Sequence, residues 1–230
     1  LNADKIARFL EMVRRAAASG RNMVITHEPA FFSHQDTVAD YEKDATYQQK
    51  RDFLNKNGMA VFHFHDHWHG MRPDGIGVGM ARELGWEKYA NPGDPRRFVL
   101  PQASLLLLAQ DIQTKLGART MRVVGNPKAQ VSRVATSWGY ATGVGPARTL
   151  ALPDVDVLIL GETREWELVE FAQDIIASGQ NKALIIVGHV MSEQAGMKHC
   201  AEWLKSFVKE VPIEYLPMEE PFWNPNDKTA

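Results

Sequence analysis

The sequence predicts an α/β protein, and two apolar segments contribute most to this prediction. Residues 155–160 and 183–187 are nearly continuous apolar runs. Such runs are typical of parallel strands that are covered on both faces. Each is followed by a segment with helical spacing of apolar residues, at 165–177 and from about residue 191. Strands that alternate with helices in this way indicate a sheet flanked by helices.

The composition excludes several classes of protein. The chain has 230 residues and a formal net charge of −2, so it lacks the basic surface of a nucleic-acid-binding protein. Cys200 is the single cysteine, which excludes an intrachain disulfide and a thiolate-rich zinc site. No apolar run has the length of a membrane span. No targeting segment is visible, so we expect a cytoplasmic protein, with an exported form whose signal has been removed as the alternative. The expected partner is a small-molecule substrate rather than a nucleic acid or a membrane.

The first third of the chain predicts two helices and two strands. Residues 1–19 have amphipathic helical spacing and end before a glycine. Residues 22–26 and 59–64 are short, β-leaning runs. Between them, the polar segment 40–57 predicts an exposed helix that ends at Asn57-Gly58.

The middle of the chain predicts a loop followed by further helices and strands. Residues 71–79 contain a proline and three glycines at alternate positions, which indicates a loop with a turn. A short helix is expected at 80–84 and a long one at 104–116, which a glycine follows. Strands are expected at 97–100 and 121–124.

The remaining segments predict two more strands. Residues 131–138 alternate in part and predict a strand, after which the glycine-rich segment 139–146 is interpreted as a connector. It lacks the spacing of a dinucleotide-binding or P-loop motif. Residues 211–216 predict the last strand, and residues 217–230 predict a proline-containing tail.

One histidine-dense stretch indicates metal binding. Half of the eight histidines alternate within seven residues, at His63, His65, His67 and His69. On a strand all four would share one face, whereas on a helical turn His65 and His69 would form an i, i+4 pair. Imidazole is the commonest protein ligand for first-row metals. A polar strand end with hydrogen-bonded histidines is the alternative that involves no metal.

Two other predicted strands also end in metal-ligand residue types. The strand at 22–26 is followed by His27 and Glu28, and the strand at 183–187 by His189. Glu193 lies four residues after His189, so a helix that began at His189 would place both on one face. Because sites in α/β sheets gather at the carboxyl ends of strands, three strand ends of this kind indicate a metal centre.

At these residues the chain resembles the Nif-three-like dinuclear-metal-centre family, often described as GTP cyclohydrolase I type 2-like. The resemblance covers about residues 23–216. It rests on an ordered set of motifs at strand ends: His27-Glu28-Pro29, His65-Asp66-His67-Trp68-His69, Leu160-Gly161-Glu162 and Gly188-His189-Val190-Met191-Ser192-Glu193. The last motif matches the family pattern best.

The resemblance implies six metal ligands: His27, Glu28, His65, His69, His189 and Glu193. Glu28 stands where the family has a second histidine, and His69 stands where it has an aspartate. This exchange keeps the number of ligands and their total charge, but it moves an oxygen donor. The resemblance further implies two divalent ions, for which zinc, iron and manganese all suit mixed nitrogen and oxygen ligands.

The fold implied by the resemblance consists of two related α/β halves, about 1–117 and 118–230, with mixed, largely parallel sheets. The metal site would lie between these halves in a single unit, and the assembly would be a toroidal homohexamer. The chain is too short for the inserted domain that longer members of the family carry.

Three functions remain open at this point. The first is a metal-dependent hydrolase acting on a heterocyclic or nucleotide-like substrate, with Glu193 as the candidate bridging ligand. In that case Glu162 and His34 are candidates for proton transfer or for orienting ligands. The second is a non-catalytic, metal-bound scaffold or regulatory protein. The third is an amidohydrolase-type site built on His63 and His65, which leaves His189 and Glu193 unexplained.

Overall fold

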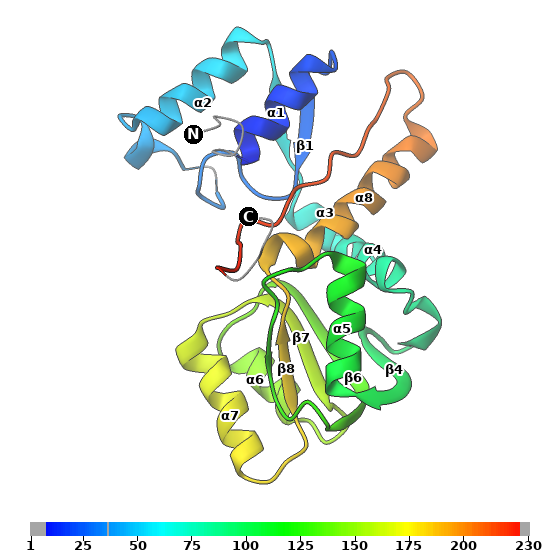
Figure 1. The fold of residues 1–230 in the computed structure, drawn as a ribbon. Coiled ribbons are helices and arrows are strands. Elements are labelled where there is room, and N and C mark those ends of the chain that lie inside the picture. The colour runs from blue at the N-terminus through cyan, green and yellow to red at the C-terminus, as the bar shows by residue number, and fades with distance from the viewer. Residues whose placement is uncertain (1–7, 36, 226–230) are drawn as a thin grey trace. The chain divides into compact units, whose positions relative to one another are not determined.

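The chain folds into two compact units, residues 1–71 and 72–230. The computed structural model describes residues 8–35 and 37–225, and the two units are shown in Figure 1. The boundary differs from the expected halves, 1–117 and 118–230. Strand β4 (Asp94–Ser104) pairs with β6 (Gln130–Tyr140), so the segments on either side of residue 117 belong to one sheet.

The N-terminal unit has two parallel strands with helices on either side of them in the sequence. Its elements are α1 (Arg8–Ala18), β1 (Met23–Thr26), η2 (Ala39–Tyr41), α2 (Ala45–Lys56), β2 (Ala60–His63) and α3 (Asp66–Gly70). Strands β1 and β2 are in register from Met23↔Ala60 to Thr26↔His63. The expected strands are thus confirmed, as is the helix at the N-terminus, whose first seven residues lie outside the described residues.

Helix α2 begins later than the sequence predicts. The Asp44 carboxylate accepts hydrogen bonds from the backbone N–H groups of Thr46 (2.9 Å) and Tyr47 (3.0 Å), so it caps the helix at that point. Tyr47, Lys50 and Leu54 form the buried face of α2. A lysine on that face was not predicted, because the polar sequence indicates an exposed helix.

The C-terminal unit contains a mixed six-stranded sheet. Its elements are α4 (Gly75–Leu84), η3 (Glu87–Tyr89), β3 (Ala90–Asn91), β4, α5 (Leu105–Leu116), β5 (Arg122–Val124), β6, α6 (Val144–Ala151), β7 (Val157–Glu162), η4 (Glu165–Val169), α7 (Glu170–Ala177), β8 (Ala183–Ile186) and α8 (His189–Phe207). The strand order is β3-β4-β6-β7-β8-β5. Strands β6, β7 and β8 are parallel, and the outer strands pair antiparallel.

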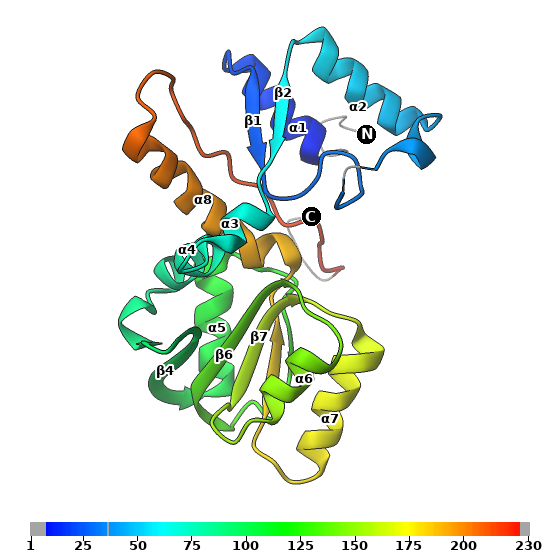
Figure 2. The same ribbon diagram turned by 180° about the vertical axis from the view of Figure 1, so that it is seen from behind.

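Helices cover both faces of the central strands, as their apolar sequences predict. On one face, Leu158 and Leu160 of β7 pack in a core cluster with Leu150 of α6 and Ala172 of α7. The alternate residues of β7 point to the other face, where α5 lies (Figure 2). Because β8 and residues 157–161 of β7 are buried, the sheet holds the carboxyl ends of both strands in place.

The loop predicted at 71–79 is confirmed for residues 71–74 and wrong for the rest, because helix α4 begins at Gly75. Asp74 caps this helix through the N–H of Ile76 at 2.8 Å. A Cβ on Gly79 would lie under 3.0 Å from the backbone of Ala195 and Gly196 in α8. The glycines therefore allow two helices to approach closely, which is a tertiary effect that local turn preference does not reveal.

The strand predicted at 211–216 is also wrong, since these described residues are irregular. Two side chains fix this part of the chain. The Tyr215 hydroxyl donates to Gln194 Oε1 at 3.2 Å, and the buried Glu220 carboxylate accepts from the N–H groups of Arg119 (2.6 Å) and Thr120 (3.1 Å). The segment 139–146, interpreted as a connector, contains the end of β6 and the start of α6. Among the described residues, no helix is both long and apolar enough to cross a membrane.

Candidate metal centre

The parallel pairing of β1 and β2 brings histidines from two motifs to one sheet edge. Thr26 pairs with His63, so the residues that follow each strand leave the sheet at the same end. His27 follows β1 directly, and His65 is the N-cap of α3. Helix α3 then carries His69 one turn further on, as the i, i+4 alternative predicts.

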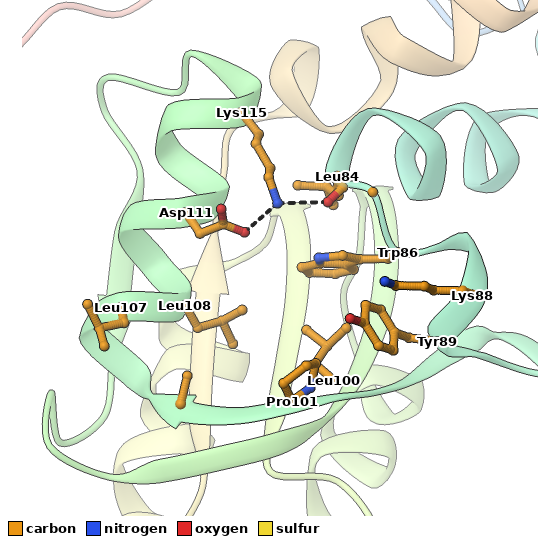
Figure 3. Close-up of a pocket in the computed structure, with 12 residues that line it drawn as sticks. Leu84, Trp86, Lys88, Tyr89, Leu100, Pro101, Leu107, Leu108, Asp111 and Lys115 are labelled. Carbon is orange, nitrogen blue, oxygen red and sulfur yellow. Dashed lines mark hydrogen bonds and ion pairs between the residues drawn. The ribbon is translucent and has the colours of Figure 1, made fainter.

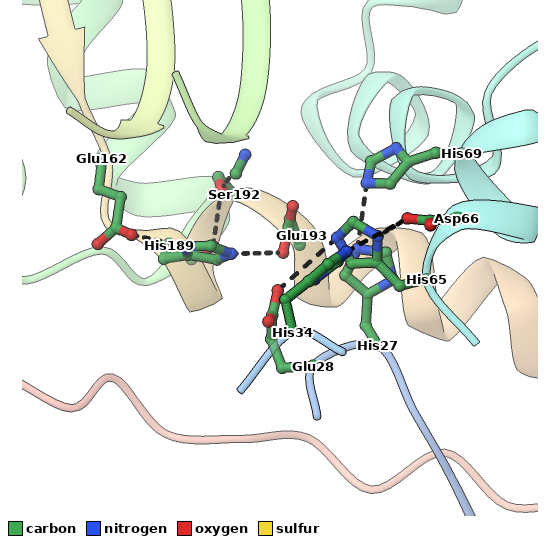
Figure 4. Close-up of polar contacts among 11 residues, drawn as sticks. His27, Glu28, His34, His65, Asp66, His69, Glu162, His189, Ser192 and Glu193 are labelled. Carbon is green, nitrogen blue, oxygen red and sulfur yellow. Dashed lines mark hydrogen bonds and ion pairs between the residues drawn. The ribbon is translucent and has the colours of Figure 1, made fainter. Parts of the chain in front are cut away.

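Three of these histidines form a compact group in the N-terminal unit. One ring nitrogen each of His27, His65 and His69 lies within 4.8 Å of the others, and His27 Nε2 is 3.2 Å from His69 Nε2 (Figure 4). In a tetrahedral zinc site with Zn–N distances of about 2.0–2.1 Å, neighbouring ligand nitrogens lie about 3.3 Å apart. The donor types and their spacing therefore fit a divalent metal ion.

His65 is held in the tautomer that leaves Nε2 available to a metal. Its Nδ1 donates to Asp66 Oδ1 at 2.8 Å. Burial lowers the pKa of the His65 imidazole, and the neighbouring His27 and His69 lower it further, although the bond to Asp66 opposes this shift. A lowered pKa favours the neutral imidazole, which is the form that binds metals.

Glu28 and His34 lie at the edge of this group. Glu28 Oε1 is 4.0 Å from His65 Nε2, and the Glu28 side chain is half-exposed. His34 Nε2 is 3.5 Å from Asp66 Oδ1, which places His34 beside the carboxylate that holds His65. His63 packs edge-on against His34, with ring centroids 5.7 Å apart. The three-histidine group itself uses His65 with His27 and His69 rather than with His63.

The C-terminal unit places His189 and Glu193 together, as their spacing predicts. Helix α8 begins at His189, directly after Gly188, whose φ of 95° turns the chain from the end of β8. His189 Nε2 is 3.0 Å from Glu193 Oε2, and the Glu193 side chain is 7% exposed. The first turn of α8 thus presents one nitrogen and one oxygen ligand side by side.

Glu162 contacts the other nitrogen of the same histidine. Strands β7 and β8 are parallel neighbours, so Glu162 at the end of β7 lies next to the start of α8. Glu162 Oε1 accepts from His189 Nδ1 at 3.0 Å (Figure 4). A carboxylate that holds Nδ1 fixes both the ring and the tautomer of a histidine ligand.

Sequence reasoning missed two residues that support this arrangement. The Gly139 N–H donates to Ser192 Oγ at 2.9 Å, and Ser192 Oγ donates to the His189 carbonyl at 2.6 Å. A Cβ on Gly139 would lie under 3.0 Å from Glu193 Oε1, and φ at Gly139 is 71°. A glycine directly after the predicted strand 131–138 could have indicated a close approach of the backbone to the site. A flexible connector, however, accounts for a glycine at that position equally well.

Each unit therefore contains a histidine whose Nδ1 is bonded to a carboxylate and whose Nε2 faces other ligand-type atoms. In the N-terminal unit this histidine is His65 with Asp66, and in the C-terminal unit it is His189 with Glu162. Imidazole nitrogen and carboxylate oxygen are suitable donors for zinc, iron and manganese. Both groups fit the predicted metal chemistry.

Comparison with known proteins shows the same fold in solved structures. A Bacillus cereus protein related to NIF3 matches with a TM-score of 0.71 at 15% identity, over 95% of this chain and 87% of its own. The Staphylococcus aureus hypothetical protein SA1388 matches with a TM-score of 0.68 at 17% identity, over 87% and 77%. Reduced HcgD from Methanocaldococcus jannaschii matches with a TM-score of 0.64 at 16% identity, over 88% and 77%.

The sequence comparison is more specific than the structural one. No curated protein sequence matches the chain. The profile of the Duf34/NIF3 (NGG1p interacting factor 3) family, however, matches residues 9–221 and thus nearly the whole chain. Together with the α/β fold and its mixed sheet, this match shows that the chain belongs to the Duf34/NIF3 family.

Proposed function

We propose that the protein is a metal-dependent hydrolase with a dinuclear centre of divalent ions. The ligands are those that the sequence motifs indicate: His27, Glu28, His65, His69, His189 and Glu193. The observation that carries the proposal is the three-histidine group, in which His27 Nε2 and His69 Nε2 are 3.2 Å apart. A hydrogen bond between the two rings would account for this pair alone, whereas a shared cation also accounts for the nitrogen of His65 beside them.

The chain's own residues have distinct roles in this proposal. Two bound divalent ions would activate water and polarise the bond to be cleaved. Asp66 and Glu162 hold the Nδ1 protons of His65 and His189, which orients Nε2 of each ring. His34 is 45% exposed and close to Asp66, so it is suited to exchange a proton with solvent.

The proposed substrate is a small heterocyclic or nucleotide-like molecule. This part of the proposal rests on the sequence resemblance, because the geometry of the ligand groups does not select a substrate. The protein is further proposed to be a homohexamer, and light scattering on the purified protein tests that assembly. A particle mass near six times 25.8 kDa would support the hexamer, and a monomer would contradict it.

Elemental analysis tests the metal centre. We expect about two divalent ions per chain after reconstitution with zinc or manganese, and a loss of at least one in His65→Ala. His67→Ala is the matched control, because His67 is an exposed histidine of the same short helix. Absence of bound metal in the reconstituted wild type would contradict the proposal.

A hydrolysis screen separates the enzyme from the alternative role. Phosphodiesters, amides and purine nucleotides are offered to the metal-loaded wild type and to Glu193→Gln. Metal-dependent turnover that Glu193→Gln abolishes would support the hydrolase. Full metal loading without turnover of any of these classes would instead favour a metal-bound scaffold or regulatory protein.

A further inference from the structure

Lys50 is a buried lysine in the inward face of helix α2. Its side chain points to the same side as Tyr47 and Leu54, and the residue is only 5% exposed. Burial lowers the pKa of the Lys50 ammonium group. Lysine is almost never fully buried unless its charge has a partner, so this position requires a physical explanation.

Aromatic rings and one carbonyl supply the partners of Lys50. Its Nζ lies 4.1 Å from the ring centroid of Phe32, 4.5 Å from that of Phe9 and 5.5 Å from that of Phe31. Nζ also donates a hydrogen bond to the backbone carbonyl of Ala30. The face of an aromatic ring carries partial negative charge, so each of these rings attracts the buried ammonium group.

Two of these rings and the carbonyl belong to one short segment, residues 27–34. This segment begins with His27 and Glu28 and ends with His34. Within it Ala30 is buried and Phe31 packs on Tyr47 of α2, with ring centroids 4.9 Å apart. The contacts of Lys50 therefore fall in the middle of the segment, between the residues with metal-binding chemistry.

The backbone of the same segment adopts a strained conformation. Phe32 has a φ of 69°, in the left-handed region that glycine adopts readily and other residues adopt only with strain. Its ring is held between Lys50 and Tyr41, whose ring centroid is 5.5 Å away. Since Phe32 is 53% exposed, burial of its own ring compensates only in part. The ammonium group supplies an additional contact that favours the strained turn.

We propose that Lys50 is a positioning residue, which fixes the segment 27–34 and thereby presents Glu28 and His34 beside the three-histidine group. The inference rests on the proposed metal-binding function of that group. Lys50 acts from helix α2 through the segment rather than as a metal ligand. Its contacts with Ala30, Phe31 and Phe32 transmit the rigidity of the helix to the segment.

Hydrogen exchange followed by mass spectrometry tests the positioning role directly. Lys50→Met removes the ammonium group and keeps an unbranched apolar side chain of similar length. Lys56→Met is the matched control, because Lys56 is an exposed lysine near the end of the same helix. We expect the backbone amides of the segment 27–34 to exchange about tenfold faster in Lys50→Met and to keep the wild-type rate in Lys56→Met. Unchanged exchange in that segment would overturn the inference.

Binding of Co²⁺ tests the consequence for the metal site. We expect Lys50→Met to weaken Co²⁺ binding by about tenfold and to alter the visible spectrum of the bound ion, as loss of a supporting contact does at other metal sites. Lys56→Met should keep the affinity and spectrum of the wild type. Unchanged Co²⁺ binding in a folded Lys50→Met protein would contradict the role at the metal site.

The two measurements separate this inference from the proposed function. If wild type binds no Co²⁺, the proposed function fails, while the exchange experiment still decides whether Lys50 fixes the segment. Should Lys50→Met not fold, Phe32→Ala replaces it, because a half-exposed ring can be removed without loss of the core. In Phe32→Ala we expect about threefold faster amide exchange in the segment and about threefold weaker Co²⁺ binding. Wild-type exchange and affinity in this variant would overturn the inference.

Discussion

Oε1 of Glu162 accepts a hydrogen bond from Nδ1 of His189 at 3.0 Å, while Nε2 of the same ring is 3.0 Å from Glu193 Oε2. One imidazole thus lies between two carboxylates that come from different elements, β7 and α8. The parallel pairing of β7 with β8 brings these elements together, so the arrangement depends on the central sheet.

Replacement of Glu162 by glutamine should weaken metal binding. The amide can no longer accept as a charged group, so His189 loses the partner that fixes its tautomer. We expect the metal dissociation constant to rise about 10–100-fold, as is typical when a carboxylate behind a histidine ligand is lost. Competition with a chelator measures this constant, and Glu170→Gln is the control, because Glu170 is an exposed residue of α7. Equal affinity in both variants would show that Glu162 does not support the ligand.

Gly139→Ala should displace Glu193. The new Cβ would meet Glu193 Oε1 under 3.0 Å, and the positive φ at this position would cost about 1–2 kcal/mol in addition. We expect a marked loss of metal per chain together with a lower melting temperature. Gly145→Ala provides the comparison, since a Cβ there meets nothing within 4 Å. Wild-type metal content in Gly139→Ala would contradict the predicted displacement.

Alanine substitutions at two glycines of helix α4 should change the free energy of unfolding in opposite directions. Gly79→Ala forces a Cβ against the backbone of Ala195 and Gly196, and such overpacking costs about 1–3 kcal/mol. A Cβ at Gly77 would have the Asp74 Cβ at 3.9 Å, which is an ordinary contact. The higher helix propensity of alanine in Gly77→Ala should therefore stabilise the protein by up to about 1 kcal/mol. Urea unfolding measures both changes. Equal free energies for the two variants would show that α4 and α8 do not pack closely at Gly79.

Cys200 should be unreactive in the folded protein. The residue is 1% exposed, and burial raises the pKa of its thiol to about 11. The reactive thiolate is therefore rare at pH 8, and an aromatic disulfide reagent cannot reach it. Absorbance of the released thiol should stay near zero until denaturant is added and then reach one equivalent per chain. Rapid labelling of the native protein would contradict this burial.

Asp156 should make the stability of the C-terminal unit sensitive to acid. Burial alone would raise the pKa of its carboxyl group, but hydrogen bonds from Arg133 and Ser132 outweigh this effect and lower the pKa. Because the folded-state pKa lies below the unfolded one, the stabilisation is present above the unfolded value. It is lost as pH falls through the folded value.

The corresponding variant is Asp156→Asn, which should be less stable at neutral pH by about 2 kcal/mol. The difference in free energy of unfolding between this variant and the wild type should decrease as the pH falls, because the wild-type carboxylate then becomes protonated and loses its charge. Chemical unfolding at several pH values measures this difference. Asp174→Asn, on the exposed side of α7, should show no such trend. A constant difference between Asp156→Asn and wild type at every pH would refute the linkage.

The sequence predicted those parts of the fold and site that local spacing determines. The apolar run at 155–160 is typical of a buried strand, and the i, i+4 spacing places His189 and Glu193 on one face because helix α8 begins at His189. The Gly75–Gly79 segment was misjudged because its helix depends on contact with Gly196, which is distant in the sequence. Lys50 was expected on a solvated face, because its aromatic partners come from α1 and from the segment after β1.

The contact between Glu220 and the turn after α5 has a consequence for synthesis of the chain. The donors at Arg119 and Thr120 precede their acceptor by about 100 residues, so they leave the ribosome long before it. Until then the turn can bond only to water, and β5, which follows it, also lacks its partner β8. This edge of the sheet is therefore completed only after synthesis has passed Glu220, close to the end of the chain.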